Sequence, residues 1–378
     1  MSLVLNGTTG ISGTNALTGV TSVNSGQVSG RRNIVINGEM KVAQRSTSVT
    51  GLGAAAGYFT LDRFSIATAA SAGRFTMAQI ADGPAGIANC LKITTTTADT
   101  SIAAGEYLIL GQPIEGQDLQ QLKKGTASAK QVTVSFYVKG NAAALYVCEL
   151  FDGNNGRSIT QSFAVTTSWN RIELTFAADT SDPLNDDNAV SLYIIFWLHA
   201  GSNFTSGTFA VNTWADNVNA NRAAVDDLTS IFDATSRTLS ITGIQMEIGT
   251  QATDFESRSY GEELALCQRY CVAWTFSGSY SNIVAAMATA SGTVAVGDLI
   301  LPVTHRVKPT GIVYSGDAVT SITSGYGVGG AGTLVIGTYS NPHSLNLRLN
   351  STSGLTAGHA TKIACSGSGD LYTTGGEL

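Results

Sequence analysis

The chain carries little charge for its length. Asp, Glu, Lys and Arg make up 13% of its 378 residues, about half of the usual share of roughly 25%. Hydrophobic residues nevertheless make up 43%, and the formal net charge is only -6, so the composition is not that of a disordered chain. Low charge combined with many Gly, Ser, Thr and Asn residues indicates a β-rich protein with neutral polar surfaces and frequent turns.

Long basic and long apolar runs are both missing. The largest basic clusters are the pairs Arg31-Arg32 and Lys123-Lys124, so no surface that follows a phosphate backbone is predicted, and nucleic acid is excluded as a main partner. The longest apolar run, residues 190–200, is interrupted by Ser191 and His199. It is shorter than the roughly 18 residues that a membrane helix needs, so no membrane insertion is predicted.

The sequence also lacks a disulfide pattern and a secretion signal. Its five cysteines are odd in number and widely scattered, which does not fit a disulfide framework. The opening residues, MSLVL, form a short apolar start without a basic region, so no signal peptide is predicted. We therefore expect synthesis in the cytoplasm, where thiols stay reduced.

Signals for catalysis are few. The chain has four histidines and no G-x-S-x-G sequence, so no nucleophile with its base is predicted. Glycoside hydrolysis would need a pair of carboxylates on either side of the bond, and no local context marks such a pair. We predict that the protein is not an enzyme.

What the sequence has in abundance is the alternation typical of strands. Val132, Val134, Phe136 and Val138 alternate with mostly polar residues, and similar runs lie at 145–150, 172–176 and 190–198. Many such strands separated by turns predict an all-β, antiparallel, jelly-roll-type sandwich. In the run 190–198 the second row is also apolar and contains Tyr193, Ile195 and Trp197. A strand of this kind is expected to be central in a sandwich or covered at an interface.

The end of the sandwich is marked by a strand, a loop and a helix. Alternation over 241–248 predicts that Ile244, Met246 and Ile248 share one buried face. Ser259 precedes Glu262 by three residues, the spacing of a capping box. Leu264, Cys267 and Cys271 are expected to line one side of the helix that this box begins.

These signals divide the chain into four parts. Residues 1–32 form a segment rich in Gly, Ser, Thr and Asn, which we assign to attachment or oligomer pairing, with a flexible tail as the alternative. Residues 33–258 form the jelly-roll β-sandwich, within which 203–233 is expected to be a long loop with short ordered pieces. Residues 259–271 form a short linking helix, and residues 272–378 form a second small β-domain.

Several ordered blocks carry a family resemblance. Residues 32–38 (RNIVING) with Gln44-Arg45, and residues 242–270 (TGIQMEIGTQATDFESRSYGEELALCQRY), resemble the opening and closing signatures of a phage virion module. LDRF at 61–64, QPIEG at 112–116 and VTVSF at 132–136 recur in the same order, and PVTHRVKPT at 302–310 echoes a further block. Such modules occur in tail fibres and other appendage proteins of tailed phages, including cyanophages, and are similar to jelly-roll carbohydrate-binding domains.

The resemblance implies a non-enzymatic tail fibre, made in the host cytoplasm and located in the virion. We expect a homotrimer that docks on other tail or neck proteins through residues 1–32 and binds host-surface glycan. It also implies that 272–378 is a distal tip that contacts the receptor. The alternatives are an architectural adaptor, neck or capsid-decorating fibre without a receptor, and a glycan-degrading tailspike.

Two sets of residues are candidates for binding. Aromatic side chains can stack on the apolar faces of sugars, and five of them stand beside Gly, Ser or Asn or in turn-rich segments: Trp214, Tyr280, Tyr326, Tyr339 and Tyr372. Their alternative role is packing in the core or between subunits. Asp182, Asp186 and Asp187 offer the oxygen ligands that Ca²⁺ prefers, the alternative being solvated loop acids. No other cofactor is expected.

Overall fold

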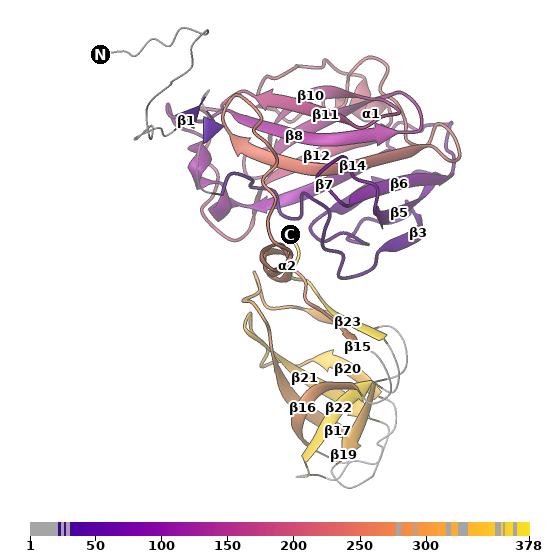
Figure 1. The fold of residues 1–378 in the computed structure, drawn as a ribbon, viewed down its shortest axis with the longest axis vertical. Coiled ribbons are helices and arrows are strands. Elements are labelled where there is room, and N and C mark those ends of the chain that lie inside the picture. Colours follow the sequence, from indigo (N-terminus) through magenta and orange to yellow (C-terminus); the bar gives the residue numbers. More distant parts are fainter. Residues whose placement is uncertain are drawn as a thin grey trace.

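The computed structural model describes residues 31–276, 281–289, 291, 293–314, 319–323, 332–351, 357, 360–365 and 369–378, together with a short strand pair at 22–23 and 26–27. Two β-regions lie on either side of the helix α2 (Tyr260–Gln268), and the end of the chain returns to the neighbourhood of this helix (Figure 1). Among the described residues, no helix has the length and hydrophobicity needed to cross a bilayer.

The first β-region consists of two six-stranded sheets. In one sheet the order is β11-β8-β14-β6-β5-β3, formed by Asn170–Phe176, Val132–Gly140, Thr238–Ile248, Cys90–Thr97, Arg74–Ile80 and Ser48–Leu52. In the other sheet the order is β13-β10-β9-β12-β7-β4, formed by Ala215–Asp216, Arg157–Val165, Ala144–Asp152, Val190–Ala200, Tyr107–Glu115 and Ser65–Ala69. Neighbouring strands pair antiparallel in both sheets. The connections hold four short helical turns, η1 (Gly116–Asp118), η2 (Gln120–Leu122), α1 (Ser202–Thr205) and η3 (Asn219–Asn221).

The chain passes repeatedly from one sheet to the other. It alternates between the sheets from β3 through β4 to β5 and β6, then through β7 to β8, through β9 and β10 to β11, and through β12 to β14. Crossing of this kind, between two packed antiparallel sheets, is the arrangement of a jelly roll. The structure therefore confirms the predicted all-β, jelly-roll-type sandwich.

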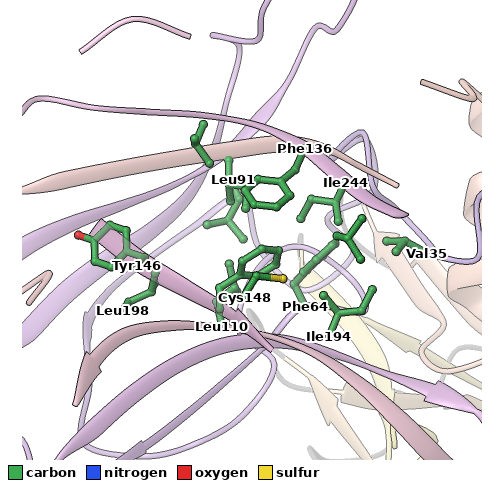
Figure 2. Packing of buried hydrophobic residues seen from close by; sticks show 14 of the residues in the cluster. Val35, Phe64, Leu91, Leu110, Phe136, Tyr146, Cys148, Ile194, Leu198 and Ile244 are labelled. Carbon is green, nitrogen blue, oxygen red and sulfur yellow. The ribbon is translucent and has the colours of Figure 1, made fainter. Parts of the chain in front are cut away.

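The core of the sandwich lies between the two sheets (Figure 2). Strand alternation directs every second side chain inward, so Phe136 from β8 is fully buried between the layers. Its ring lies edge-on to Phe163 of β10, with 5.0 Å between centroids, and edge-on to Phe196 of β12 at 5.1 Å. Edge-to-face aromatic contacts across the layers stabilise the core beyond the contribution of the apolar area that they bury.

Strand β14 departs from simple alternation. Ile244 and Met246 are fully buried, as predicted, whereas Ile248, predicted on the same face, is only half-buried against the core. Ile241 is also in the core, although alternation assigns it to the opposite row. The pairing of β14 with β8 shifts between Thr242 and Gln245, and Gly243 in this bulge has φ 62°. The extra residue of the bulge shifts the inward-facing row by one position. Inward-facing core side chains therefore lie both before the bulge (Ile241) and after it (Ile244 and Met246).

Helix α2 begins with the predicted capping box. Ser259 is the N-cap: its hydroxyl accepts from the backbone N–H of Glu262, and the Glu262 side chain accepts from the backbone N–H of Ser259. The predicted buried side is correct for Cys267, but Leu264 is only half-buried. Glu263 is buried instead, because its carboxylate accepts from the backbone N–H of Asn37 at 2.6 Å.

The motifs that carry the family resemblance meet at this helix. Gln112 forms two hydrogen bonds with the backbone of Ile36, at 2.9 and 2.8 Å. Glu115 accepts from Nε of Arg269 at 2.7 Å, and Gln44 donates to the backbone oxygen of Cys271 at 2.7 Å. Residues far apart in the sequence thus form one polar junction between the sandwich, α2 and the segment that follows.

The second β-region contains two further antiparallel sheets. One has the order β15-β23-β18, formed by Ala273–Phe276, Gly369–Thr374 and Gly311–Tyr314. The other has the order β19-β22-β16-β17-β21-β20, formed by Val319–Thr323, Ala360–Cys365, Ser281–Thr289, Val294–Ile300, Ser344–Ser351 and Gly332–Ile336. A separate core, which includes Leu345, Leu347 and Leu349, supports it. A short helix followed by a small second β-region is thus present as predicted.

The predicted attachment segment, residues 1–32, lies largely outside the described residues. Its described part consists of β1 (Ser22–Val23) and β2 (Gly26–Gln27), which pair antiparallel, and the residues Arg31 and Arg32.

Candidate functional site

The outer face of the sheet that contains β12 is unusually apolar. The register places Tyr193 between Phe151 of β9 and Pro113 of β7. Four residues further along β12, Trp197 lies between Val147 and Ile109. These side chains face away from the sandwich core, so they must be covered by something else or remain open to solvent.

The loop that follows β12 covers part of this face. Phe204 of α1 lies 5.3 Å from the ring of Trp197 and 5.3 Å from that of Tyr107, and Trp197 is only 1% exposed. Ala223 is buried in the same cluster, and its N–H donates to the carbonyl of Phe204 at 3.0 Å. The prediction of a long loop with short ordered pieces at 203–233 is confirmed. The apolar second row of β12 is therefore covered, in part, from within the chain.

The rest of the face is a groove. Its cavity volume is about 190 Å³, which is smaller than the roughly 300–1,000 Å³ of sites for drug-sized ligands, so the groove can hold only a small part of a larger ligand. The lining residues are Ser65, Ala67, Ile109, Gly111, Phe151, Tyr193, Ile195 and Arg222. Three of them are small, Ser65 and Ala67 of the edge strand β4 and Gly111 of the neighbouring β7, and the hollow forms where they stand beside the larger side chains.

An aromatic pair borders the groove. Tyr193 and Phe151 stack with 5.7 Å between ring centroids and 29° between ring planes. Gly153 in the β9–β10 turn is also close, since a Cβ there would lie 3.1 Å from Cε2 of Tyr193. Burial raises the pKa of the Tyr193 hydroxyl, which therefore stays protonated at neutral pH. The pair offers a preorganised apolar surface with a hydroxyl on one ring.

Arg222 provides the polar part of the groove. Its Nε lies 2.9 Å from Oε1 of Glu149, and its Nη2 lies 2.9 Å from Oε2. Glu149 is fully buried and also accepts from Nε1 of Trp197 at 2.7 Å. The guanidinium carbon lies 4.9 Å from the ring centroids of Phe151 and Trp197. Nη1 has no hydrogen-bond partner among the described residues, so it is free to donate to a ligand.

This combination suits a ligand that has both an apolar face and hydroxyl groups. The stacked rings can take an apolar ring face, and the N–H groups of Arg222 can donate to oxygen acceptors. The groove-lining residues include no carboxylate, and the Ser65 hydroxyl is used in a hydrogen bond to the backbone oxygen of Gly111 at 3.3 Å.

The aromatic residues predicted from the sequence lie elsewhere. Trp214 is half-buried against the sandwich core and donates from Nε1 to the backbone oxygen of Ala177 at 2.8 Å. Tyr372 lies on β23 with its ring 5.9 Å from the guanidinium of Arg45, so it belongs to the junction. Tyr339 is 85% exposed in the turn between β20 and β21. Among the described residues these three share no contact, and Tyr280 and Tyr326 lie outside them.

The candidate calcium ligands Asp182, Asp186 and Asp187 lie in the loop between β11 and β12. The described residues bring no three of the acidic side chains of this loop, including Asp182, Asp186 and Asp187, within 4.8 Å of one another. Lys124 occupies the interior of the loop instead: its Nζ lies 2.9 Å from the backbone oxygen of Asp182 and 3.0 Å from a carboxylate oxygen of Asp179. The Lys124 ammonium thus occupies oxygen acceptors at the start of this loop.

A polar cluster that the sequence did not indicate lies at the end of β12. His199 contacts the Ser230 hydroxyl through Nδ1 at 2.7 Å and a carboxylate oxygen of Glu106 through Nε2 at 3.3 Å. Asp99 completes a buried group whose ligand atoms lie within 4.8 Å of one another. Burial lowers the pKa of His199. Asp99 accepts from the backbone of Ala72, and the Ser230 hydroxyl accepts from that of Phe232, so the cluster holds the loop ends in place.

Comparison with known proteins adds only distant similarities. No family model and no curated protein matches the chain. Among solved structures it is similar to a CBM4 protein (12% identity, 48% of this chain and 77% of that chain, TM-score 0.25). It is also similar to a family 11 carbohydrate-binding module from Clostridium thermocellum in complex with a β-1,3-1,4-mixed-linked tetrasaccharide (14%, 50% and 91%, TM-score 0.27). A third similarity is to the enzymatically active domain of bacteriophage CBA120 tailspike protein 4 (11%, 57% and 21%, TM-score 0.29). At these TM-scores the likeness supports no conclusion on function.

Proposed function

We propose that this protein is a tail fibre of a tailed phage that binds host-surface glycans through the outer-sheet groove, without catalysis. The observation that carries the proposal is the open groove in which the stacked rings of Tyr193 and Phe151 stand beside a free N–H edge of Arg222. Sugar rings present apolar C–H faces and outward hydroxyls, so they match both parts of this surface.

Adhesion through such a groove depends on several copies acting together. One stacked sugar contributes little affinity, but a fibre that displays several identical grooves gains roughly 10²–10⁴ in avidity. We propose a homotrimer for this reason, with residues 1–32 docking on tail or neck proteins. The resemblance of the ordered motifs to phage appendage modules supports a location in the virion.

The motifs that carry the resemblance and the groove consist of different residues. The residues that carry the resemblance, such as Gln112, Glu115 and Arg269, lie in the polar junction. None of the groove-lining residues Tyr193, Phe151 and Arg222 lies in those motifs. A substitution in the groove therefore leaves the side chains of the junction in place.

The test is binding of the full-length protein to a glycan array and to host cells. We expect Tyr193→Ala to weaken binding roughly two- to tenfold per groove, because loss of an aromatic stack costs about 0.5–1.5 kcal/mol. Tyr260→Ala is the matched control, since it removes an equally large ring that is 57% exposed on α2, outside the groove. Equal binding by both variants would overturn the assignment of the groove and favour the C-terminal tip.

The alternatives make different predictions in the same experiment. An architectural adaptor, neck or decorating fibre would bind no glycan on the array in either form. A glycan-degrading tailspike would release shorter oligosaccharides from host polysaccharide. The proposed function requires glycan binding that depends on Tyr193 and leaves the length of the polysaccharide unchanged.

A further inference from the structure

The charge of the groove is determined by a residue beneath it. Arg222 is the only charged residue among those that line the groove. Its Nε and Nη2 are both engaged by the carboxylate of Glu149, which is fully buried. A guanidinium paired in this way with a carboxylate carries no net charge as a unit, but Nη1 keeps its N–H donors.

Because of this pairing, Arg222 keeps hydrogen-bond donors but provides no net positive charge to the groove. The free N–H groups on Nη1 can still donate to the hydroxyl or ring oxygens of a sugar. A carboxylate of the ligand, by contrast, would meet no uncompensated positive charge in the groove, and it would lose water on entering. An unpaired arginine at the same place would attract it by about 1 kcal/mol at 4 Å, even with the dielectric constant of water.

We propose that Glu149 makes the groove selective for uncharged sugar units over uronic acids by neutralising Arg222. This inference rests on the proposed function and adds the ligand class to it. The ligand is a neutral pyranose unit whose apolar face stacks on the Tyr193 and Phe151 pair and whose oxygens accept from Nη1 of Arg222. Glu149 does not touch the ligand, so it is a positioning and specificity-determining residue.

The experiment uses the full-length protein and an array with matched pairs of polysaccharides, glucan with glucuronan and galactan with galacturonan. We expect the unmodified protein to bind a neutral member of a pair with little dependence on salt. In Glu149→Gln the oxygen that accepts from Trp197 is kept, but the charge of Arg222 is released. The ratio of binding to the uronic-acid polysaccharide over binding to the neutral one should then rise at least about fivefold, because one unit charge at about 4 Å contributes about 1 kcal/mol. Binding to the uronic-acid polysaccharide should also fall with added salt.

Two further variants separate the possible results. Glu173→Gln removes one negative charge at a site whose side chain is 49% exposed, away from the groove, so the ratio should not change. Ala67→Trp fills the groove and should abolish binding to both members of each pair. If a variant fails to fold, the preference and salt dependence of the unmodified protein still decide the inference.

The outcomes distinguish this inference from the function on which it rests. Binding of the unmodified protein to the uronic-acid member, abolished by Ala67→Trp, would overturn the neutral-sugar inference and leave glycan adhesion in place. Binding to no member, or binding that Ala67→Trp does not change, would overturn adhesion through this groove. An unchanged ratio in a folded Glu149→Gln variant would remove Glu149 from its role in selectivity.

Discussion

Glu115 is fully buried at the junction, and its carboxylate accepts hydrogen bonds from three side chains. Its carboxylate accepts from Arg269 through Nε at 2.7 Å and Nη2 at 2.6 Å, from the hydroxyl of Tyr270 and from Gln117. A buried carboxylate is tolerated only when its oxygens are satisfied in this way. The segment at 112–116 therefore places this charge where its oxygens are satisfied.

The same carboxylate predicts how stability depends on pH. Burial by itself raises the pKa of Glu115, but the hydrogen bonds from Arg269 and Tyr270 outweigh this and hold the pKa below its ordinary value. A carboxyl group whose pKa is lower in the folded state stabilises the fold above its unfolded pKa of about 4.3, and this contribution is lost as the pH falls through the folded pKa. We expect the free energy of unfolding, measured in urea between pH 3 and 7, to decrease below about pH 4.3.

Glu115→Gln isolates this contribution. The variant should lose roughly 1–3 kcal/mol at pH 7, because Arg269 and Tyr270 lose a charged acceptor, and its stability should depend less steeply on pH below about 4.3. Glu173→Gln, at an exposed position, should keep the stability and the slope of the unmodified protein. Identical slopes in Glu115→Gln and the unmodified protein would contradict the assignment.

At the scale of single elements, β14 and α2 differ in how far local patterns describe them. Alternation correctly assigned Ile244 and Met246 to the core, but it missed the bulge at Gly243, which brings Ile241 into the same core. The bulge depends on pairing with β8, a partner about 100 residues away. The start of α2 needs no distant partner, because Ser259 and Glu262 cap it locally.

The cap of α2 should contribute measurably to stability. Ser259→Ala removes the acceptor for the backbone N–H of Glu262, and loss of an N-cap of this kind costs about 1 kcal/mol. Ser259→Asp keeps an acceptor at the same position and serves as the control. We expect a lower urea midpoint only for the alanine variant; an unchanged midpoint there would mean that the cap does not limit stability.

At the scale of the whole molecule, the end of the chain ties the two β-regions together. Glu377 pairs with Arg45 at 2.8 Å and with Arg63 at 2.7 Å, and Arg63 is only 1% exposed. Arg306 donates to the backbone oxygens of Gly376 and Glu377. Residues from the end of the chain thus complete the charge balance within the first β-region.

Loss of this link should be costly. Glu377→Ala leaves Arg63 buried without its carboxylate, and breaking a buried pair in this way costs about 3–5 kcal/mol. Asp82→Asn removes one partner of a surface pair with Lys139, and pairs of that kind contribute about 0–1 kcal/mol. We expect chemical denaturation followed by tryptophan fluorescence to separate the two variants clearly. Equal losses would mean that the terminal segment does not stabilise the junction.

The candidate site was the part least accessible from the sequence. Aromatic residues beside Gly, Ser or Asn were candidates for a binding surface, with packing as the alternative, and Trp214 packs on the core and Tyr372 on the junction. Local neighbours do not determine exposure, because tertiary packing decides which side chains are covered. The useful signal was the apolar second row of β12, which contains Tyr193 and which the sequence analysis recognised as needing a cover.

The amino-acid sequence alone determined the all-β class, the buried faces of the regularly alternating strands and the helix cap, because each depends on residues that are near one another in the chain. Only the tertiary structure decided that the loop after β12 covers Trp197 and leaves Tyr193 beside an open groove. It also decided that Arg222 meets Glu149, 73 residues earlier. Strand register and loop packing bring such residues together, and neither can be predicted from the periodic pattern of apolar residues in the sequence.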